Sequence, residues 1–361
     1  ETSFRHSLNG IWKFHYARNY ESTVKGFEKE EYSCRDWDDI RVPAHIQMEG
    51  YDAPQYANVQ YPWEGHEDIH PGEIPEHFNP VASYVKYFEV PEQMKGKRLF
   101  ISFQGAESGI ALWLNGKFVG YSEDSFTPSE FELTDYVKGG ENKLAAQVFK
   151  WTASSWCEDQ DFYRFSGIYR EVYLYTVPDV HVYDLQIRAI PDETLKKAEF
   201  EIKTIAWGKG SVHIVLSKDG QTVLEDSKSL GAVAAESGSR NMDADAKNND
   251  DGKGAAAQAD SLDIFTWTVE NPILWSAEDP QLYDLVLEVS DENGTLQEVI
   301  PQKIGFRRFE MKDGIMTLNG KRIVFKGVNR HEFSSVTGRC VSEAELRKDL
   351  TTMKQNNINA I

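Results

Sequence analysis

Four consecutive polar residues, Asn329-Arg330-His331-Glu332, are the side chains in this sequence best suited to chemistry. They follow an apolar run, Ile323-Val324-Phe325, and the pair Gly327-Val328. A buried strand that ends in such a cluster is typical of a barrel strand that delivers functional groups to its C-terminal rim. A lone histidine would more often be structural, but four polar residues at one strand end favour a site. We therefore treat the cluster as a candidate functional site.

A second concentration of polar groups is the acidic segment Trp156 to Arg164, with three carboxylates in four residues, Glu158, Asp159 and Asp161. Such carboxylates repel one another unless a cation, an arginine or sugar hydroxyls relieve them. The alternative is a solvated acidic turn, in which exposed charges contribute little. Aromatic residues on both flanks favour a lined pocket.

A third candidate is the loop from Gly50 to Trp63, which combines Pro and Gly with four aromatic residues. Loops with many rings and amides usually pack against another part of the protein, and binding residues often lie on loops. A structural and a functional interpretation both remain open for this loop.

Cleavage of a glycosidic bond needs two carboxylates that flank the bond, roughly 5 Å apart when configuration is retained. Glu332 could supply one, but residues 311–361 offer no convincing partner. The sequence also contains no Gly-rich phosphate loop, GxSxG elbow or HExxH helix. We therefore expect the chain by itself to be inactive.

The elements around the polar cluster predict a parallel strand–helix–strand unit. Ser342 and Glu345 form a capping-box signature, and apolar residues then recur at helical spacing, at Leu346, Leu350 and Met353. Another apolar run begins at Ile358. One such unit cannot cover both faces of a parallel sheet, so we expect the front part of a larger enzyme.

The first half of the chain reads as a β-sandwich or jelly roll. From Leu8 to Val177 short alternating strands are separated by turn signals, and helical periodicity is nearly absent. The clearest hairpin spans Ala111 to Tyr121, with Asn115-Gly116 at its turn. Further strands are expected at 143–151 and 169–176.

A second β-rich segment follows Pro178 and fits an immunoglobulin-like sandwich of six or seven strands. Turn pairs stand at Asp219-Gly220 and Asn293-Gly294. The polar, acidic stretch 235–260 predicts a disordered insert. A third segment opens near Met311 with a hairpin around Asn319-Gly320 that runs to Lys326. We therefore expect domains at 1–178, 179–310 and 311–361. The strands of the second segment are predicted at 181–190, 198–206, 211–216, 221–224, 265–269 and 282–289.

Composition restricts the partners and the compartment. A net charge of -19 argues against nucleic acid and against an anionic membrane, since both need clustered Lys and Arg. The sequence has three widely spaced cysteines, Cys34, Cys157 and Cys340, and no CxxC pair. This pattern fits a reducing compartment better than a disulfide framework. With no run long enough for a membrane span and no signal-peptide core, we expect a cytoplasmic protein.

Six motifs in one order resemble the β-galactosidases of glycoside hydrolase family 2, and the resemblance runs from Leu8 to Ile361 except for the acidic insert. It implies a jelly-roll sugar-binding domain, an immunoglobulin-like domain and the first βαβ unit of a (β/α)8 barrel. The motifs lie at Gly50–Pro54, Tyr56–Pro62, Glu158–Asp161, Phe165–Arg170, Gly327–Glu332 and Met353–Asn357.

The resemblance also implies roles for particular residues. Asn58 and Asp161 match positions that reach from the jelly roll into the galactose subsite, and Asp161 also matches a sodium ligand. His331 matches a barrel histidine that contacts galactose hydroxyls, with Arg330 and Glu332 beside it. The acid/base and nucleophile glutamates and the main magnesium ligands of the family would lie beyond Ile361.

For the full-length protein the resemblance implies retaining hydrolysis of β-D-galactosides such as lactose, with Mg²⁺ and Na⁺ as cofactors, and a homo-oligomer is plausible. Two alternatives remain: a non-catalytic carbohydrate-binding fragment, and a related β-glucuronidase or β-mannosidase.

Overall fold

The computed structural model describes residues 4–158, 161–231 and 261–361, without the side chains of Phe162 and Ser261. The insert predicted at 235–260 lies outside the described residues. The chain divides into two compact units, each formed by a long stretch and a short C-terminal stretch. The first unit combines residues 1–176 with 330–352, and the second combines 177–329 with 353–361.

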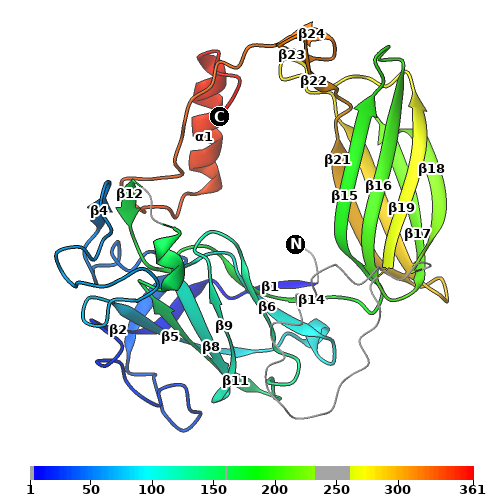
Figure 1. The fold of residues 1–361 in the computed structure, drawn as a ribbon. Helices are drawn as coiled ribbons and strands as arrows, with labels where there is room; N and C mark the ends of the chain where they lie inside the picture. Colours follow the sequence, from blue (N-terminus) through cyan, green and yellow to red (C-terminus); the bar gives the residue numbers. More distant parts are fainter. Residues whose placement is uncertain (1–3, 159–160, 232–260) are drawn as a thin grey trace. The chain divides into compact units, whose positions relative to one another are not determined.

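Two antiparallel sheets face each other in the first unit and enclose its core (Figure 1). Alternate residues of the strands point inward, as in β2, where Trp12 and Phe14 are buried and Ile11 is exposed. One sheet has the order β1 (Arg5–Ser7), β14 (Val172–Thr176), β6 (Leu99–Phe103) and β10 (Ser129–Glu132). The other has the order β3 (Asp38–Val42), β2 (Gly10–Ala17), β5 (Val81–Glu89), β11 (Glu141–Phe149), β8 (Gly109–Leu114) and β9 (Lys117–Glu123).

Two short strand pairs and two 3₁₀ turns complete this unit. β4 (Gln55–Ala57) pairs with β12 (Phe162–Arg164), and β7 (Ala106–Glu107) pairs with β13 (Gly167–Ile168). The 3₁₀ turns are η1 (Glu92–Met94) and η2 (Ala153–Trp156).

Two of the predicted Asn-Gly hairpin turns are confirmed, and in both turns the Asn and the Gly have positive φ. Asn115 and Gly116 join β8 to β9 with φ of 51° and 80°. Asn319 and Gly320 take φ of 52° and 72°. Two-residue hairpin turns of this type need positive φ at both positions, which Asn and Gly tolerate best.

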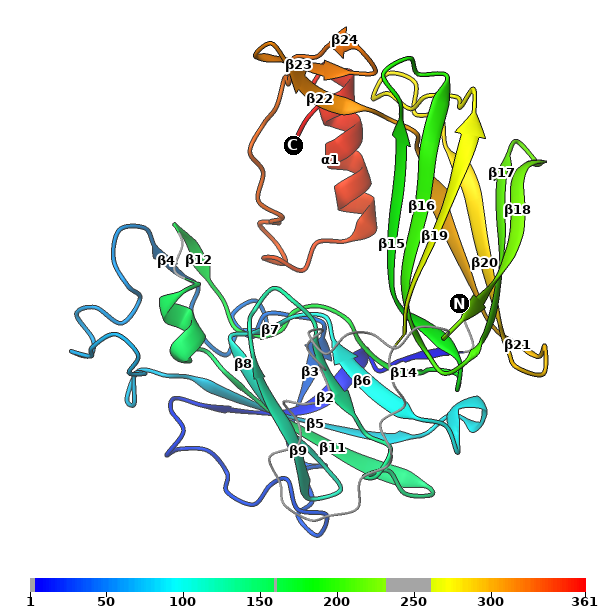
Figure 2. The ribbon, with the colours of Figure 1, turned by 45° about the vertical axis from the view of Figure 1, so that its right-hand side comes forward.

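The second unit contains a sandwich of a three-stranded and a four-stranded sheet, as predicted (Figure 2). β21, which contains Pro301, is not among the predicted strands; proline is tolerated there because β21 is an edge strand. The first sheet has the order β15 (His181–Pro191), β16 (Lys197–Trp207) and β19 (Ser261–Glu270). The second has the order β18 (Gln221–Leu230), β17 (Gly210–Lys218), β20 (Tyr283–Asp291) and β21 (Leu296–Ile304).

The C-terminal segment, residues 309–361, contains β22 (Phe309–Lys312), β23 (Ile315–Leu318), β24 (Lys321–Arg322) and the helix α1 (Glu343–Gln355). The strand expected to reach Lys326 ends at Arg322, and Val324 and Phe325 are 55% and 50% exposed rather than buried. Within this segment the Ile323 N–H donates to the Met316 carbonyl of β23 at 3.0 Å and the Lys326 carbonyl accepts from the Asn359 N–H at 3.1 Å, and these isolated contacts do not bury a strand on both faces. Of the predicted parallel pairing, the described residues form a single β-bridge, between Gly327 and Ala360.

The helix start is confirmed, because the backbone N–H of Ser342 donates to Glu345 Oε2 at 2.8 Å and the Glu345 N–H donates to Ser342 Oγ at 3.3 Å. No residue of α1 is fully buried: on the predicted apolar stripe Leu346 and Met353 are half-buried and Leu350 is exposed. Within the described ranges, no helix has the length and apolar character needed to cross a membrane.

Candidate functional site

The pairing of β4 with β12 brings two of the sequence-predicted residues opposite each other. Ala57 faces Phe162 in the antiparallel register, and Tyr56 faces Tyr163. Asn58 directly follows Ala57 and Asp161 directly precedes Phe162, so both lie at the same end of the ribbon. Both residues are exposed. Residues that are about 100 positions apart in the sequence therefore meet because of one short strand pair.

The hydroxyl of Tyr56 joins these two side chains. It donates a hydrogen bond to Asp161 Oδ1. This hydrogen bond to a carboxylate raises the pKa of Tyr56, and a hydrogen bond with the Asn58 side chain acts in the opposite direction. Tyr56 is 57% exposed, so its ring lies at the surface beside both groups. The sequence reasoning missed Tyr56; its position two residues before Asn58, on the same strand face, is the signal that could have found it.

A buried polar network holds the loop that leads into β4. Lys150, only 2% exposed, pairs with Asp52 at 2.7 Å. Gln47 Nε2 donates to Asp52 Oδ2 at 2.9 Å and to Ser166 Oγ at 2.8 Å. Burial raises the pKa of Asp52, but Lys150 and the hydrogen bonds outweigh it, so the pKa is lowered. The ionised Asp52 thus fixes the start of the Gly50 loop.

Most of the aromatic residues in that loop are structural. Tyr61 stacks on Trp63 with ring centroids 5.1 Å apart, and Trp156 contacts both rings at 4.5 and 4.8 Å. Trp63 is buried, and the Trp156 indole N–H donates to the Glu73 carbonyl at 2.7 Å. The second half of this loop is therefore structural. Tyr56 and Asn58 are exposed, so the functional interpretation applies to them.

The acidic segment also divides by role. Glu158 accepts hydrogen bonds from the Ser125 N–H at 2.7 Å and from the Ser125 hydroxyl at 2.8 Å, so it anchors the chain. Asp159 and Gln160 lie outside the described residues. Asp161 is the carboxylate of this segment that reaches the ribbon end with Asn58.

The residues of the polar cluster Asn329–Glu332 have different surroundings in the structure. Arg330 pairs with Asp349 of α1 at 2.6 Å, and Glu332 lies 4.0 Å from Arg330. Asn329 belongs to the second unit, whereas 330–352 belongs to the first. His331 and Glu332 are exposed. Arg330 therefore has a structural partner in α1.

Phe333 connects this cluster to the strand ribbon. Its ring stacks on Tyr163 with centroids 5.2 Å apart and planes 13° apart, and it also contacts Phe165 at 6.2 Å. Tyr163 in turn lies 5.4 Å from the ring of Tyr56. Phe333, which follows Glu332, is thus connected through the ring of Tyr163 to Tyr56.

The described residues could supply some, but not all, of the ligands that a cation needs. Among the described residues, no group of three or more His, Cys, Asp or Glu side chains could hold a metal ion. The Asp161 carboxylate and the Asn58 amide oxygen are hard donors of the kind that alkali and alkaline-earth cations prefer. They could contribute to such a site but do not complete it.

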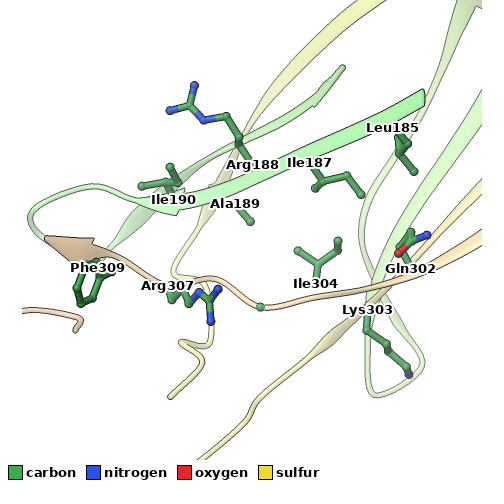
Figure 3. Close-up of a pocket in the computed structure, with 11 residues that line it drawn as sticks. Leu185, Ile187, Arg188, Ala189, Ile190, Gln302, Lys303, Ile304, Arg307 and Phe309 are labelled. Carbon is green, nitrogen blue, oxygen red and sulfur yellow. The ribbon is translucent and has the colours of Figure 1, made fainter. Parts of the chain in front are cut away.

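A separate groove of about 600 Å³ lies in the second unit, between the edge strands β15 and β21. Figure 3 shows Ile187 and Ile304 facing each other across it. Its polar lining residues are Gln302 and the cations Arg188, Lys303 and Arg307, and its described lining includes no carboxylate. This groove lacks the acidic groups of a glycosidase site, and we assign no function to it.

Three family descriptions match successive parts of the chain. "Glycosyl hydrolases family 2, sugar binding domain" matches residues 5–178, "Glycosyl hydrolases family 2" matches 180–307, and "Glycosyl hydrolases family 2, TIM barrel domain" matches 309–361.

The curated relatives point to the same family. The chain is 54% identical over 359 residues to a β-galactosidase of Halalkalibacterium halodurans and 46% identical over 364 residues to one of Streptococcus thermophilus. These alignments cover 99% and 100% of the chain but 33% of each relative, so the chain spans about a third of their length.

Solved structures share the fold at low identity. A β-glucuronidase of Bacteroides uniformis aligns with a TM-score of 0.74 and 20% identity, over 97% of this chain and 38% of that one. A β-glycosidase of Bacteroides vulgatus aligns with a TM-score of 0.71 and 22% identity, over 99% and 41%. At these identities the likeness concerns the fold alone. Together, the three matched domains and the close relatives show that this chain belongs to glycosyl hydrolase family 2.

Proposed function

We propose that this chain is the N-terminal third of a retaining β-galactosidase and that Asn58, Asp161 and His331 line its galactose subsite. The observation that carries the proposal is the ribbon end, where two exposed polar side chains meet through the hydroxyl of Tyr56. The high identity to curated β-galactosidases supports the choice of galactosides as substrates.

In this proposal the chain binds and orients the sugar while other residues break the bond. Amide and carboxylate groups such as Asn58 and Asp161 are suited to hydrogen-bond sugar hydroxyls, and His331 would bind hydroxyls whose hydrogen bonds strengthen in the transition state. One carboxylate of the complete barrel would attack the anomeric carbon. A second would protonate the leaving oxygen and then activate water.

We propose that Asp161 also contributes to a sodium site and that the full-length enzyme uses Mg²⁺ held by other residues. The bound sodium would neutralise negative charge near the sugar. We further propose a cytoplasmic homo-oligomer, with domains at 1–178, 179–310 and 311–361. The free thiols of Cys34, Cys157 and Cys340 support a reducing compartment. Light scattering of the full-length protein tests the assembly.

Kinetics of the full-length protein test the function. We expect hydrolysis of 4-nitrophenyl β-D-galactoside, with little turnover of the β-glucuronide or the β-mannoside. Asn58→Ala and Asp161→Asn should each lower kcat/KM by roughly 30-fold or more, because losing one partner of a hydrogen bond that substrate desolvates typically costs about 2–5 kcal/mol. Asp36→Asn, at an exposed site in the same unit, is the matched control. Preference for the glucuronide, or wild-type rates in both site variants, would contradict the proposal.

A further inference from the structure

Arg339 lies on a tight hairpin that follows Phe333. The backbone of Ser334 and Gly338 exchanges two hydrogen bonds, at 2.7 and 2.9 Å. Gly338 has φ of +63°, and a Cβ placed there would lie 2.8 Å from Cδ2 of His45 and 3.2 Å from Cζ of Phe165. The hairpin therefore sits directly on the jelly-roll fold, at a distance that only glycine allows.

The side chain of Arg339 enters the jelly roll and pairs with Glu107. The two side chains are only 10% and 9% exposed. The guanidinium carbon lies 5.3–5.6 Å from three ring centroids, those of Phe126, Phe165 and Tyr169. Burial raises the pKa of Glu107, and the charge of Arg339 opposes this shift. An arginine held over aromatic faces and against a buried carboxylate has little freedom to move.

Stability alone explains this pair poorly. Desolvation of two charges largely cancels their attraction, and apolar replacements of buried ion pairs are often neutral or stabilising. What the pair does provide is a specific attachment, because Arg339 reaches a buried carboxylate on the distant strand β7. The contact joins residues 232 positions apart.

The anchored hairpin is physically continuous with the candidate site. Phe165 lies under the Arg339 guanidinium and also contacts Phe333. Phe333 stacks on Tyr163, whose ring contacts Tyr56 between Asn58 and Asp161. Arg339 and Phe333 are thus two attachment points immediately after His331.

We propose that Arg339 is a positioning residue: its ion pair with Glu107 fixes the 333–340 segment on the jelly roll and so sets His331 in register with Asn58 and Asp161. The catalytic part of this inference rests on the proposed function. The structural part does not, so the two can fail separately.

Hydrogen–deuterium exchange of the 361-residue chain tests the structural part. Arg339→Met should speed exchange across 331–340 by at least tenfold, and Glu107→Gln should do the same if Arg339→Met does not fold. The control is Lys143→Met, which removes another buried cation of the same unit, one that donates to the carbonyls of residues 27, 29 and 32. It should leave exchange of 331–340 unchanged. Unaltered exchange of 331–340 in Arg339→Met and in Glu107→Gln would overturn the proposal.

A double-mutant cycle in the full-length protein tests the catalytic part. Arg339→Met should lower kcat on a β-galactoside by about tenfold, since small misplacements of a positioned group are costly. In the His331→Ala background the same change should cost less than twofold, because a residue that acts through His331 loses its effect when His331 is absent. Equal losses in both backgrounds would show that Arg339 acts independently of His331. A wild-type protein without galactosidase activity would refute the proposed function, and the exchange result would still decide the anchoring.

Discussion

His45 offers a quantitative test of the packing beneath the site. Its ring is fully buried and stacks between Phe165 at 4.4 Å and Tyr169 at 5.0 Å. Burial, and then the charge of Arg339, lower its pKa well below the ordinary 6.5. The unfolded chain therefore takes up a proton near pH 6.5 while the folded chain does not. Stability from this group is present above pH 6.5 and is lost as the pH falls.

The magnitude follows from that difference. At pH 5.5, below the ordinary pKa, keeping the folded histidine neutral should cost on the order of 1 kcal/mol of unfolding free energy. His45→Phe keeps a flat ring in the stack but removes the titration. Urea unfolding followed by tryptophan fluorescence at pH 7.5 and 5.5 should therefore show a smaller loss of stability in the variant, by on the order of 1 kcal/mol.

The comparison uses the pH dependence and not the absolute stability, because the substitution changes packing as well. Identical pH dependence in the two proteins would refute the claim that His45 stays neutral in the folded protein.

Three further predictions concern the first unit. Lys143→Met should lower the unfolding free energy by about 3 kcal/mol, since three backbone carbonyls lose a charged donor; an unchanged thermal midpoint would contradict this. Gly338→Ala should cost more than about 1 kcal/mol, because its positive φ and its contact with His45 leave no room for a methyl group, and urea unfolding measures it. Asp161→Asn should lower the pKa of Tyr56 toward 10, since the carboxylate that raises it is gone; NMR of ¹³Cζ-labelled tyrosine against pH checks this, and an unmoved titration would disprove the contact.

Local patterns predict the sandwich folds because the relevant physics is local. Alternation along a strand and positive φ at Asn115-Gly116 depend only on neighbouring residues. The capping box at Ser342 is equally local. The strand expected at 323–326 differs because a parallel strand depends on neighbours far away in the sequence, and only the bridge from Gly327 to Ala360 forms.

The candidate site was predictable in its residue types but not in its construction. The motifs single out Asn58 and Asp161, yet nothing in the sequence says that their strands pair or that Tyr56 joins them. Arg339 gives no local signal at all, because its partner Glu107 is 232 positions away. Long-range pairings of this kind are what the structure adds.

The most direct test of the proposed galactose subsite is His331→Ala in the full-length protein, with His70→Ala at an exposed loop position as the control. Hydrogen bonds that strengthen in the transition state affect kcat more than KM. We predict a fall in kcat of at least tenfold with little change in KM or in thermal midpoint, and wild-type behaviour for the control. A lowered thermal midpoint with unchanged kcat per folded molecule would contradict the account and make His331 a structural residue.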